Sequence, residues 1–480
     1  MIAVAVLAVV ALATIIVFFY LKALIWPQQE KVTAYTTGRI GKSKIPGMPK
    51  SDPENGNLSD ITAAGSFHEF LLNLHSKYGP VASFWYGSQY YVSLASPKAW
   101  KDHIKIFDRP PELFEFLLPL IGPRSIQYIN GAEGKERRRT YDPSFSHTSI
   151  KNYYSSFQLA VDSMIEKISS LPAGEHIPLT EYMSMLTIKA VSKSTFGDFF
   201  KEDGKAVKLL HHYEIVMEVL NQKMADKVES QEKFNNALKE WHDFMLSAVN
   251  HRRSNPPKED DKIFIDILME YCKTEKELTS DAISYFVAAF HTTAFMMVWS
   301  LYYLCQHQEI QEGVHNEILG ILGKDGKVDH SNLDQLPYIK RVFNESMRCS
   351  VLAPFAARVN YEEDVDVQGY TIPKGTSVIH ALGVVLQDVT IWPDPDRFDP
   401  DRFLPENVAK RHKLAHSPFG FAGKRICPGY RIAYAEGAVF LASLLQQFKF
   451  KLVEGQDIHR KFGFVTLPSD EVWVTVLKRE

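Results

Sequence analysis

The sequence predicts a mainly helical protein with small β-sheets, an α+β fold, and one transmembrane helix at its N-terminus. Apolar residues recur at helical spacing in long runs, such as residues 430–445. Two short runs rich in strand-forming residues, separated only by Gly-Ser, predict a β-hairpin over residues 81–94. Residues 2–21 are almost purely apolar, and roughly 20 such residues are needed to span a bilayer as a helix.

Composition indicates an ordinary globular domain and excludes several classes of protein. The 480 residues are 45% hydrophobic and 23% charged. The net charge of −3 provides no basic field that would attract nucleic acid. The four cysteines have no CxxC spacing, so neither a disulfide framework nor a zinc site is indicated, and the chain suits a reducing compartment.

Residues 1–26 are predicted to form a membrane anchor. A cleavable signal peptide is the alternative, but no basic region precedes the apolar run and Trp26-Pro27 replaces a small-residue cleavage site. Lysines and arginines follow the segment and none precedes it, so the positive-inside rule places the rest of the chain in the cytosol. We expect a single-pass protein of the endoplasmic reticulum membrane with a cytosolic domain, or of an inner membrane with similar topology.

A hinge and one large domain are expected after the anchor. Residues 27–57 are polar and contain prolines and glycines, which predicts a hinge, and the folded domain is expected to span residues 58–480. Within it, residues 283–305 carry no Asp, Glu, Lys or Arg, and the run is long enough for a second membrane span. Its internal histidine and hydroxyl residues favour the central helix of a large domain instead.

The loop at residues 417–429, Ser-Pro-Phe-Gly-Phe-Ala-Gly-Lys-Arg-Ile-Cys-Pro-Gly, presents one sulfur, that of Cys427. Its glycines and prolines predict a stiff turn ahead of a helix that starts near Tyr430. A helix N-terminus favours a thiolate, which is a soft metal ligand, and Arg425 could meet a carboxylate on the group that carries the metal. A thiolate on haem iron, with arginines on the propionates, needs this combination, and a buried structural cysteine is the alternative.

Residues 419–429 resemble the haem-binding loop of cytochromes P450, in which the cysteine binds iron. The resemblance implies haem b with Cys427 as the axial iron ligand, and it implies that Phe419, Gly423 and Arg425 contact the cofactor. The loop departs from the usual pattern at Gly420, where the family usually has phenylalanine.

Two arginines elsewhere are candidates for the haem propionates by the same resemblance. Arg138 falls where the family places a propionate arginine, whereas the other two arginines of the run 137–139 are predicted to lie on a solvated helix face. Gly134 stands where the family commonly has tryptophan. Arg358 lies in the segment that passes the haem edge in this family, and Tyr361 replaces a further arginine that many members have.

Residues 288–293, Ala-Ala-Phe-His-Thr-Thr, align with the family's oxygen-binding turn, where a small pair, an acid and a threonine are usual. The small Ala288 would let the helix pass close to a flat cofactor, and Thr292 would supply the hydroxyl that delivers protons. His291 replaces the acid and can relay protons near neutral pH. The alternative is that His291 is an ordinary core histidine and that Thr292 bonds to a backbone carbonyl.

Glu345 and Arg348, at i and i+3, share one face of a predicted helix. The resemblance adds Arg402, from the Trp-Pro-Asp-Pro segment at 392–403, and implies that the three lock the cysteine loop in place. If they are buried, the three charges need one another.

The matches follow the family's order from about residue 58 to the C-terminus, and segments such as 56–61, 65–75 and 381–388 look closest to cytochrome P450 family 20, subfamily A. Members of that subfamily are generally treated as orphans without an assigned substrate. The resemblance implies a monooxygenase that inserts one atom of O2 into an apolar small molecule such as a lipid or sterol. The implied electron source is NADPH through NADPH-cytochrome P450 reductase, and the other implied partners are cytochrome b5 and the membrane.

Two alternative functions follow from the departures. His291 in place of the acid leaves open a haem-thiolate isomerase or dehydratase that works without a reductase. Gly134 and Gly420, together with His291, leave open a non-enzymatic haem-binding protein. Elsewhere, His412 and His416 lack the glutamate of a zinc protease motif and are predicted to be surface histidines.

Overall fold

The computed structural model describes residues 44–172, 174–224, 231–258 and 262–479. The predicted anchor at 1–26 and most of the predicted hinge lie outside the described residues. The described chain from Ile45 onward forms one compact unit. Ile45 and Asn57 are buried, and the Met48 N–H donates to the Ser83 carbonyl at 2.8 Å. The unit therefore begins ahead of the predicted boundary at 58.

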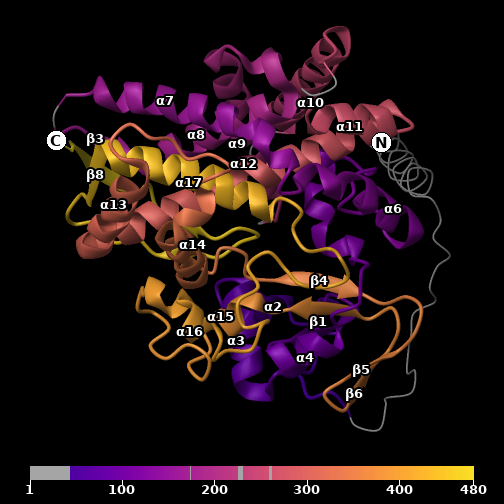
Figure 1. Ribbon diagram of the computed structural model, residues 1–480. Helices are drawn as coiled ribbons and strands as arrows, with labels where there is room; N and C mark the ends of the chain where they lie inside the picture. The colour runs from indigo at the N-terminus through magenta and orange to yellow at the C-terminus, as the bar shows by residue number, and fades with distance from the viewer. Residues whose placement is uncertain (1–43, 173, 225–230, 259–261, 480) are drawn as a thin grey trace, which may run out of the picture. The chain divides into compact units, whose positions relative to one another are not determined.

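Most of the unit is helical, as predicted, and the longer helices pack on one another in one layer of the molecule (Figure 1). The α-helices are α2 (Leu58–Ala63), α3 (Phe67–Tyr78), α4 (Pro97–Asp102), α5 (Leu118–Ile121), α6 (Gly131–Tyr141), α7 (Tyr154–Ser169), α8 (Leu179–Phe196), α9 (Asp203–Met224), α10 (Gln231–Ser254), α11 (Phe264–Tyr271), α12 (Glu275–Gln306), α13 (Gln308–Leu322), α14 (Pro337–Ser350), α15 (Leu382–Leu386), α16 (Pro405–Val408) and α17 (Tyr430–Gln447).

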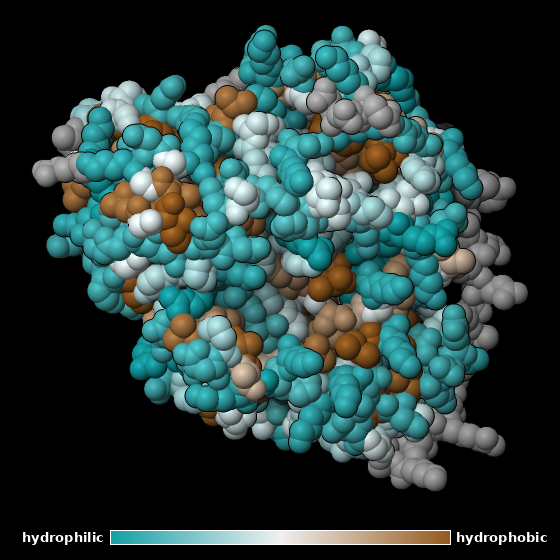
Figure 2. Space-filling view, in the orientation of Figure 1, coloured by the Kyte–Doolittle hydropathy of each residue, from teal (hydrophilic) through white to brown (hydrophobic). Residues whose placement is uncertain are grey.

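The long apolar helix α12 is the central element of the helical layer. It packs against α8, α14 and α17, and Met297, Val298 and Trp299 near its middle are buried. Among the described helices α12 alone is long and apolar enough to cross a membrane, but 61% of its most apolar window is buried inside the unit. The face of the molecule shown in Figure 2 is mostly hydrophilic, with separate apolar patches. The prediction of a central core helix over 283–305 is confirmed.

The strands form small sheets, and the predicted hairpin is confirmed. In the largest sheet the order is β1-β2-β7-β4, in which β1 and β2 are antiparallel, β7 runs parallel to β2, and β4 is antiparallel to β7. A second sheet has the order β3-β11-β8, and β5-β6 and β9-β10 are two-stranded. The strands are β1 (Val81–Tyr86), β2 (Gln89–Leu94), β3 (His176–Pro178), β4 (Ala356–Val359), β5 (Val365–Val367), β6 (Tyr370–Ile372), β7 (Ser377–His380), β8 (Phe448–Leu452), β9 (Arg460–Lys461), β10 (Leu467–Pro468) and β11 (Trp473–Lys478).

Local sequence signals explain where the elements next to the cysteine loop begin and end. Helix α4 begins after Ser96, whose hydroxyl accepts the Ala99 N–H, and its first residue is a proline. Helix α17 begins at Tyr430, directly after Pro428 and Gly429, and runs into β8. Cys427 thus lies just before the first turn of α17.

Candidate active site

The loop that carries Cys427 is held by backbone hydrogen bonds and by one obligatory glycine. The Cys427 N–H donates to the Phe419 carbonyl at 2.8 Å, and the Gly423 N–H donates to the Ile104 carbonyl at 2.7 Å. Gly423 has a φ of +61°, and a Cβ atom there would lie 2.2 Å from the Ile106 carbonyl oxygen. Only glycine fits this close approach of two backbones, so Gly423 fixes the loop against residues 104–107.

The surroundings of Cys427 shift the pKa of its thiol in opposite directions. Burial raises its pKa, while the Gly429 N–H that donates to the sulfur and the nearby Arg138 and Arg109 act in the lowering direction. Burial outweighs the donor at the start of α17, so the pKa of the thiol is raised. The position ahead of a helix N-terminus does not by itself favour the thiolate here. Metal coordination requires the deprotonated sulfur, and binding an ion supplies the charge that favours it.

Four arginines gather around this loop and are called here the basic cluster: Arg109, Arg138, Arg358 and Arg425. They come from the segment before η1 (Pro111–Leu117), from α6, from β4 and from the loop itself. Arg138, Arg358 and Arg425 are at most 5% exposed. The sequence predicts these three for the cofactor but not Arg109, whose only sequence signal is an Asp-Arg-Pro-Pro segment between structured regions.

Most of the hydrogen bonds that the basic cluster donates go to backbone carbonyls. Arg425 donates through Nη1 to Ile126 at 2.9 Å and through Nη2 to Ile129. Arg358 donates through Nη1 to its neighbour Ala357 at 2.6 Å. The Nε atoms of both arginines are buried and have no hydrogen-bond partner among the described residues.

Among the residues that the structure describes, one carboxylate bonds to the basic cluster, and it reaches one member. Arg138 Nε donates to Asp142 Oδ1 at 2.6 Å, and Arg138 Nη2 donates to the Ile426 carbonyl at 2.8 Å. Burial, together with Arg109 and Arg138, lowers the pKa of Arg425 to about 8. Burial and the other three arginines lower the pKa of Arg358 well below its ordinary value.

The basic cluster and the sulfur together fit a porphyrin with its iron. Buried guanidinium groups with free donors are suited to carboxylates, which they bind in charge-assisted hydrogen bonds. A haem group has two propionates for the cluster and one axial iron position for the thiolate. The residues that are present therefore match haem, on the observation that buried cations outnumber the carboxylates that contact them.

A second buried group, called here the carboxylate-centred cluster, consists of Glu345, Arg348 and Arg402, as predicted. Arg348 grips Glu345 with two hydrogen bonds, from Nε to Oε2 at 2.7 Å and from Nη2 to Oε1 at 2.8 Å. Arg402 Nε lies 3.3 Å from Glu345 Oε1, which is an ion pair without hydrogen-bond geometry. The Asp399 N–H also donates to Glu345 Oε1 at 2.9 Å, so the carboxylate joins α14 to the segment that contains η7 (Pro400–Phe403).

This cluster is linked to the cysteine helix through Asn344. His416 Nε2 lies 3.2 Å from the Asn344 carbonyl, and the Tyr434 hydroxyl on α17 donates to Asn344 Oδ1. His416 packs on Phe403, and burial lowers its pKa to about 3. The prediction that His416 is a surface histidine is therefore wrong, whereas His412 is exposed.

The oxygen-turn residues lie together on α12. Thr292 Oγ1 donates to the Ala288 carbonyl at 2.7 Å, and Ala288 is exposed although its helix crosses the core. His291 lies against the rings of Tyr213 and Phe295, at 5.6 and 4.9 Å between centroids. Burial lowers the pKa of His291 to about 4, so the imidazole is neutral at physiological pH. In the described part of the chain, no hydrogen bond of these three residues reaches the cysteine loop.

Comparison with known proteins decides the family. A sequence model described as Cytochrome P450 matches residues 46–476 of this chain. The chain belongs to the cytochrome P450 family. It is 31% identical over 442 residues to "Cytochrome P450 20A1" of Bos taurus, covering 91% of this chain and 93% of the relative. It is 32% identical over 447 residues to the protein of that name in Rattus norvegicus, covering 91% and 94%. A more distant relative, "Cytochrome P450 4F12" of Homo sapiens, is 28% identical over 394 residues, and the alignment covers 75% of this chain and 74% of that protein.

The resemblance to cytochrome P450 family 20, subfamily A, is thereby confirmed. Cytochromes P450 are oxidoreductases of the monooxygenase type, with haem, O2 and an external electron donor, so the enzyme class is established with the family.

Gly134 departs from the P450 pattern for a reason that the structure supplies. A Cβ atom at this position would lie 2.3 Å from the Ile129 carbonyl oxygen and 3.1 Å from Arg425 Nη2. The space that a tryptophan needs is thus taken by the guanidinium of Arg425 and by the carbonyl to which it donates. The absence of a side chain at Gly134 therefore leaves the space that the buried guanidinium of Arg425 occupies.

The prediction of a solvated face is wrong for Arg137 and holds for Arg139, which is exposed. The Arg137 side chain is only 11% exposed, and its Nη1 lies 3.1 Å from Asp281 Oδ2. Asp281 is fully buried, accepts the Ile126 N–H at 2.6 Å, and has its pKa raised to about 6 by burial. Asp281 is not among the predicted site residues, although an acid just before an uncharged run of residues is a signal that the sequence offers.

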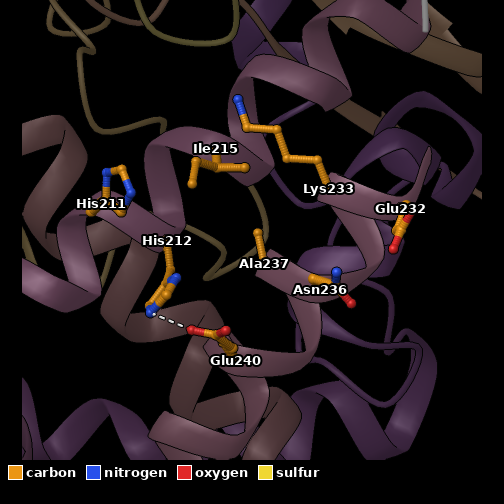
Figure 3. A pocket seen from close by; sticks show the side chains of 8 residues that line it. All are labelled: His211, His212, Ile215, Glu232, Lys233, Asn236, Ala237 and Glu240. Atoms are coloured by element: carbon orange, nitrogen blue, oxygen red, sulfur yellow. Dashed lines mark ion pairs between the residues drawn. The ribbon is translucent and has the colours of Figure 1, made fainter. Parts of the chain in front are cut away.

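A cavity of about 500 Å3 lies outside this site, between α9 and α10 (Figure 3). His212 Nε2 on α9 faces Glu240 Oε2 on α10 at 3.0 Å across it. None of the predicted site residues lines this cavity.

Proposed function

We propose that the protein is a membrane-anchored monooxygenase that inserts one atom of O2 into an apolar small molecule, of the lipid or sterol class. The second oxygen atom leaves as water, and the two electrons come from NADPH through NADPH-cytochrome P450 reductase. The observation that carries the proposal is the buried excess of arginine around Cys427, because it matches the charge of the cofactor that the family uses.

Cys427 would hold the haem iron, and Arg109, Arg138, Arg358 and Arg425 would hold the propionates. The bound haem supplies the binding and activation of O2. The backbone bonds of Gly423 and Cys427 keep the sulfur in one position, and the carboxylate-centred cluster fixes the segment that contains η7 to α14. These residues therefore orient the cofactor rather than transfer protons.

Proton delivery is assigned to α12. The Thr292 hydroxyl donates to the carbonyl of Ala288, one helical turn earlier, and Ala288 is exposed. A hydroxyl in that position accepts a proton from one side while it donates to another acceptor. His291 is neutral beside Tyr213, so it can pass a proton between its two nitrogens but does not store one.

Localisation follows from the segment ahead of the compact unit. We propose that residues 1–26 anchor the protein in the endoplasmic reticulum membrane, that the following hinge leads to the unit that begins at Ile45, and that this unit faces the cytosol. This arrangement brings the domain to the surface where apolar substrates partition and where membrane-bound partners, the reductase and cytochrome b5, would meet it.

A reconstituted system tests the activity. Purified full chain is mixed with lipid vesicles, reductase, NADPH and a fraction of cellular lipids, and product oxygen is traced with isotope-labelled O2. We expect labelled product that depends on NADPH and reductase. Thr292→Val should consume NADPH but form less product, whereas Thr292→Ser, which keeps the hydroxyl, should stay close to the original protein.

A haem-thiolate isomerase or dehydratase is the second candidate, and the neutral aromatic surroundings of His291 favour it. Rearrangement of a hydroperoxide needs no delivery of protons from solvent and no electron donor. Product that forms from a lipid hydroperoxide without NADPH and carries no label from O2 would support this candidate and contradict the monooxygenase.

A further inference from the structure

One ring of the cysteine loop, that of Phe421, stacks on two rings from outside the loop. Trp100 of α4 and His380 at the end of β7 have their centroids 5.0 and 4.7 Å from that of Phe421, with an interplanar angle of 26° in both cases. Trp100 and His380 are each 1% exposed. Phe421 is thus held by two elements that do not belong to its loop.

His380 does not stand alone in this stack. His103, the residue that ends α4, places its Nδ1 atom 2.9 Å from His380 Nε2, and it is also 1% exposed. Burial lowers the pKa of His103 to about 3 and lowers that of His380 well below its ordinary value, and Arg358 acts in the same direction on both. The two imidazoles are therefore neutral, with one donating and the other accepting, and this bond fixes the plane of the His380 ring.

The segment from Trp100 to Phe107 touches the loop at successive points. Trp100 stacks on Phe421, and the Ile104 carbonyl accepts the Gly423 N–H at 2.7 Å. The Phe107 ring lies 4.2 Å beneath the guanidinium of Arg425. The segment thus follows the loop from Phe421 towards Cys427, and the histidine pair ties the segment to the sheet.

The stack also accounts for the departure at Gly420. A Cβ atom at Gly420 would meet nothing within 4 Å, so no packing there is lost, and its φ of +75° is one that glycine adopts without strain. Phe419 packs against Tyr434 of α17, and Phe421 packs into the stack. The aromatic support of the loop is therefore carried by the residues that flank position 420.

We propose that His380, fixed by His103, is a positioning residue that sets the geometry of the cysteine loop through Phe421. The inference rests on the proposed function, since it concerns how firmly the loop holds haem through Cys427. It predicts that loss of the His380 ring loosens the loop and weakens the bond between sulfur and iron, without any contact between His380 and the cofactor.

The test compares full-length haem-loaded protein with His380→Leu, which removes the ring, and His380→Phe, which keeps the ring but loses the bond to His103. His75→Gln is the matched control. His75 is also a buried, neutral histidine with two hydrogen bonds, to the Gly79 carbonyl and to Ser93 of the same sheet, and neither partner belongs to the loop. The measurements are the rate of haem transfer to a scavenger protein and the carbon-monoxide spectrum after reduction.

We expect haem loss from His380→Leu to be about tenfold faster, because one aromatic stack contributes on the order of a tenfold change in an equilibrium constant. In the carbon-monoxide spectrum of His380→Leu, part of the thiolate band should shift to the position seen when the thiolate has left the iron. His380→Phe should be intermediate in rate and spectrum, and His75→Gln should match the original protein in both. If His380→Leu does not fold, the intermediate rate of His380→Phe decides. If the original protein carries no haem, the proposed function itself fails. If the original protein shows a normal thiolate band and the His380 variants lose haem at an unchanged rate, only this inference is overturned.

Discussion

The basic cluster and the carboxylate-centred cluster are both buried and rich in arginine, yet their charges are arranged in opposite ways. In the carboxylate-centred cluster, Glu345 accepts from Arg348, from Arg402 as an ion pair and from the Asp399 N–H. In the basic cluster, only Arg138 has a bonded carboxylate among the described residues, that of Asp142. Each arginine of the first cluster is thus paired with a carboxylate, whereas the second cluster keeps positive charge for an anion.

The difference separates residues that hold the fold from residues that hold the cofactor. Removing one member from a satisfied buried ion pair leaves an uncompensated charge, so the fold loses stability with or without haem. Removing one arginine from a group of like charges relieves repulsion in the haem-free protein. It lowers only the stability of the haem-bound protein. The two clusters should therefore respond to mutation differently in the haem-free and the haem-bound protein.

The largest expected effect is that of Glu345→Gln. Arg348 and Arg402 would be left buried without a counter-charge, and the free energy of unfolding should fall by about 3–5 kcal/mol in both the haem-free and the haem-bound protein. Urea unfolding of the two forms measures it. Asp243→Asn, which breaks the exposed pair with Lys239, should leave the midpoint where it is. A change confined to the haem-bound form would contradict a structural role for Glu345.

The next effect is that of Arg358→Leu, which should act on the bound state alone. Its guanidinium has a weakly bonded Nη2, 3.5 Å from the Ala422 carbonyl, and an unpartnered Nε, so the haem-free protein should keep its stability or gain slightly. Haem affinity should fall by about 10- to 100-fold, because a hydrogen bond to a charged group contributes about 1.5–3 kcal/mol.

Arg139→Ala is the control for Arg358→Leu, since Arg139 is exposed on α6. Haem titration and urea unfolding of the haem-free protein should both match the original protein. An Arg358→Leu protein whose haem-free form loses as much stability as its haem-bound form would remove the distinction between the two clusters.

A smaller effect depends on pH and on His416, which packs beside the carboxylate-centred cluster. Burial lowers the pKa of His416 from 6.5 to about 3, so the folded state keeps the imidazole neutral while the unfolded chain takes up a proton below pH 6.5. Stability from this group is present above pH 6.5 and is lost as the pH falls towards 3, by up to about 2 kcal/mol at pH 5. Urea midpoints at pH 7 and pH 5 should therefore fall less in His416→Gln than in the original protein.

The exposed His412 provides the control for that comparison. His412→Gln should show the same fall between pH 7 and pH 5 as the original protein, because its side chain reaches solvent in the folded state. Parallel curves for His416→Gln and the original protein would mean that His416 titrates freely in the fold.

The smallest effect is expected at Glu436 on α17, a buried acid to which no cation is bonded. Both of its carboxyl oxygens are buried without a partner in hydrogen-bond geometry among the described residues. Burial raises its pKa well above the ordinary value, and Thr293 acts in the lowering direction. Burial thus favours the neutral acid, and Glu436→Gln should change the unfolding free energy by about 1 kcal/mol or less. A gain of several kcal/mol would instead mean that Glu436 is ionised in the fold.

Features that repeat along the chain could be predicted from sequence, whereas features that join distant segments could not. The hairpin over 81–94, the central helix α12 and the helix after Cys427 follow from periodicity and turn residues, and they are confirmed. The local sequence around Arg109 and His380 does not point to the loop, because they reach it only through folding that brings residues 100–109 and 377–380 beside it. The burial of Arg137 could not be predicted for the same reason, since its partner Asp281 lies on another helix.

The central claim is that the Cys427 sulfur binds haem iron, and the spectrum of the reduced, carbon-monoxide-bound protein tests it most directly. Purified full chain should show the red-shifted band of a thiolate ligand, and Cys427→Ser should lose that band while the remaining fold is retained. A protein that carries no porphyrin, or a Cys427→Ser variant with the same spectrum as the original, would contradict the account.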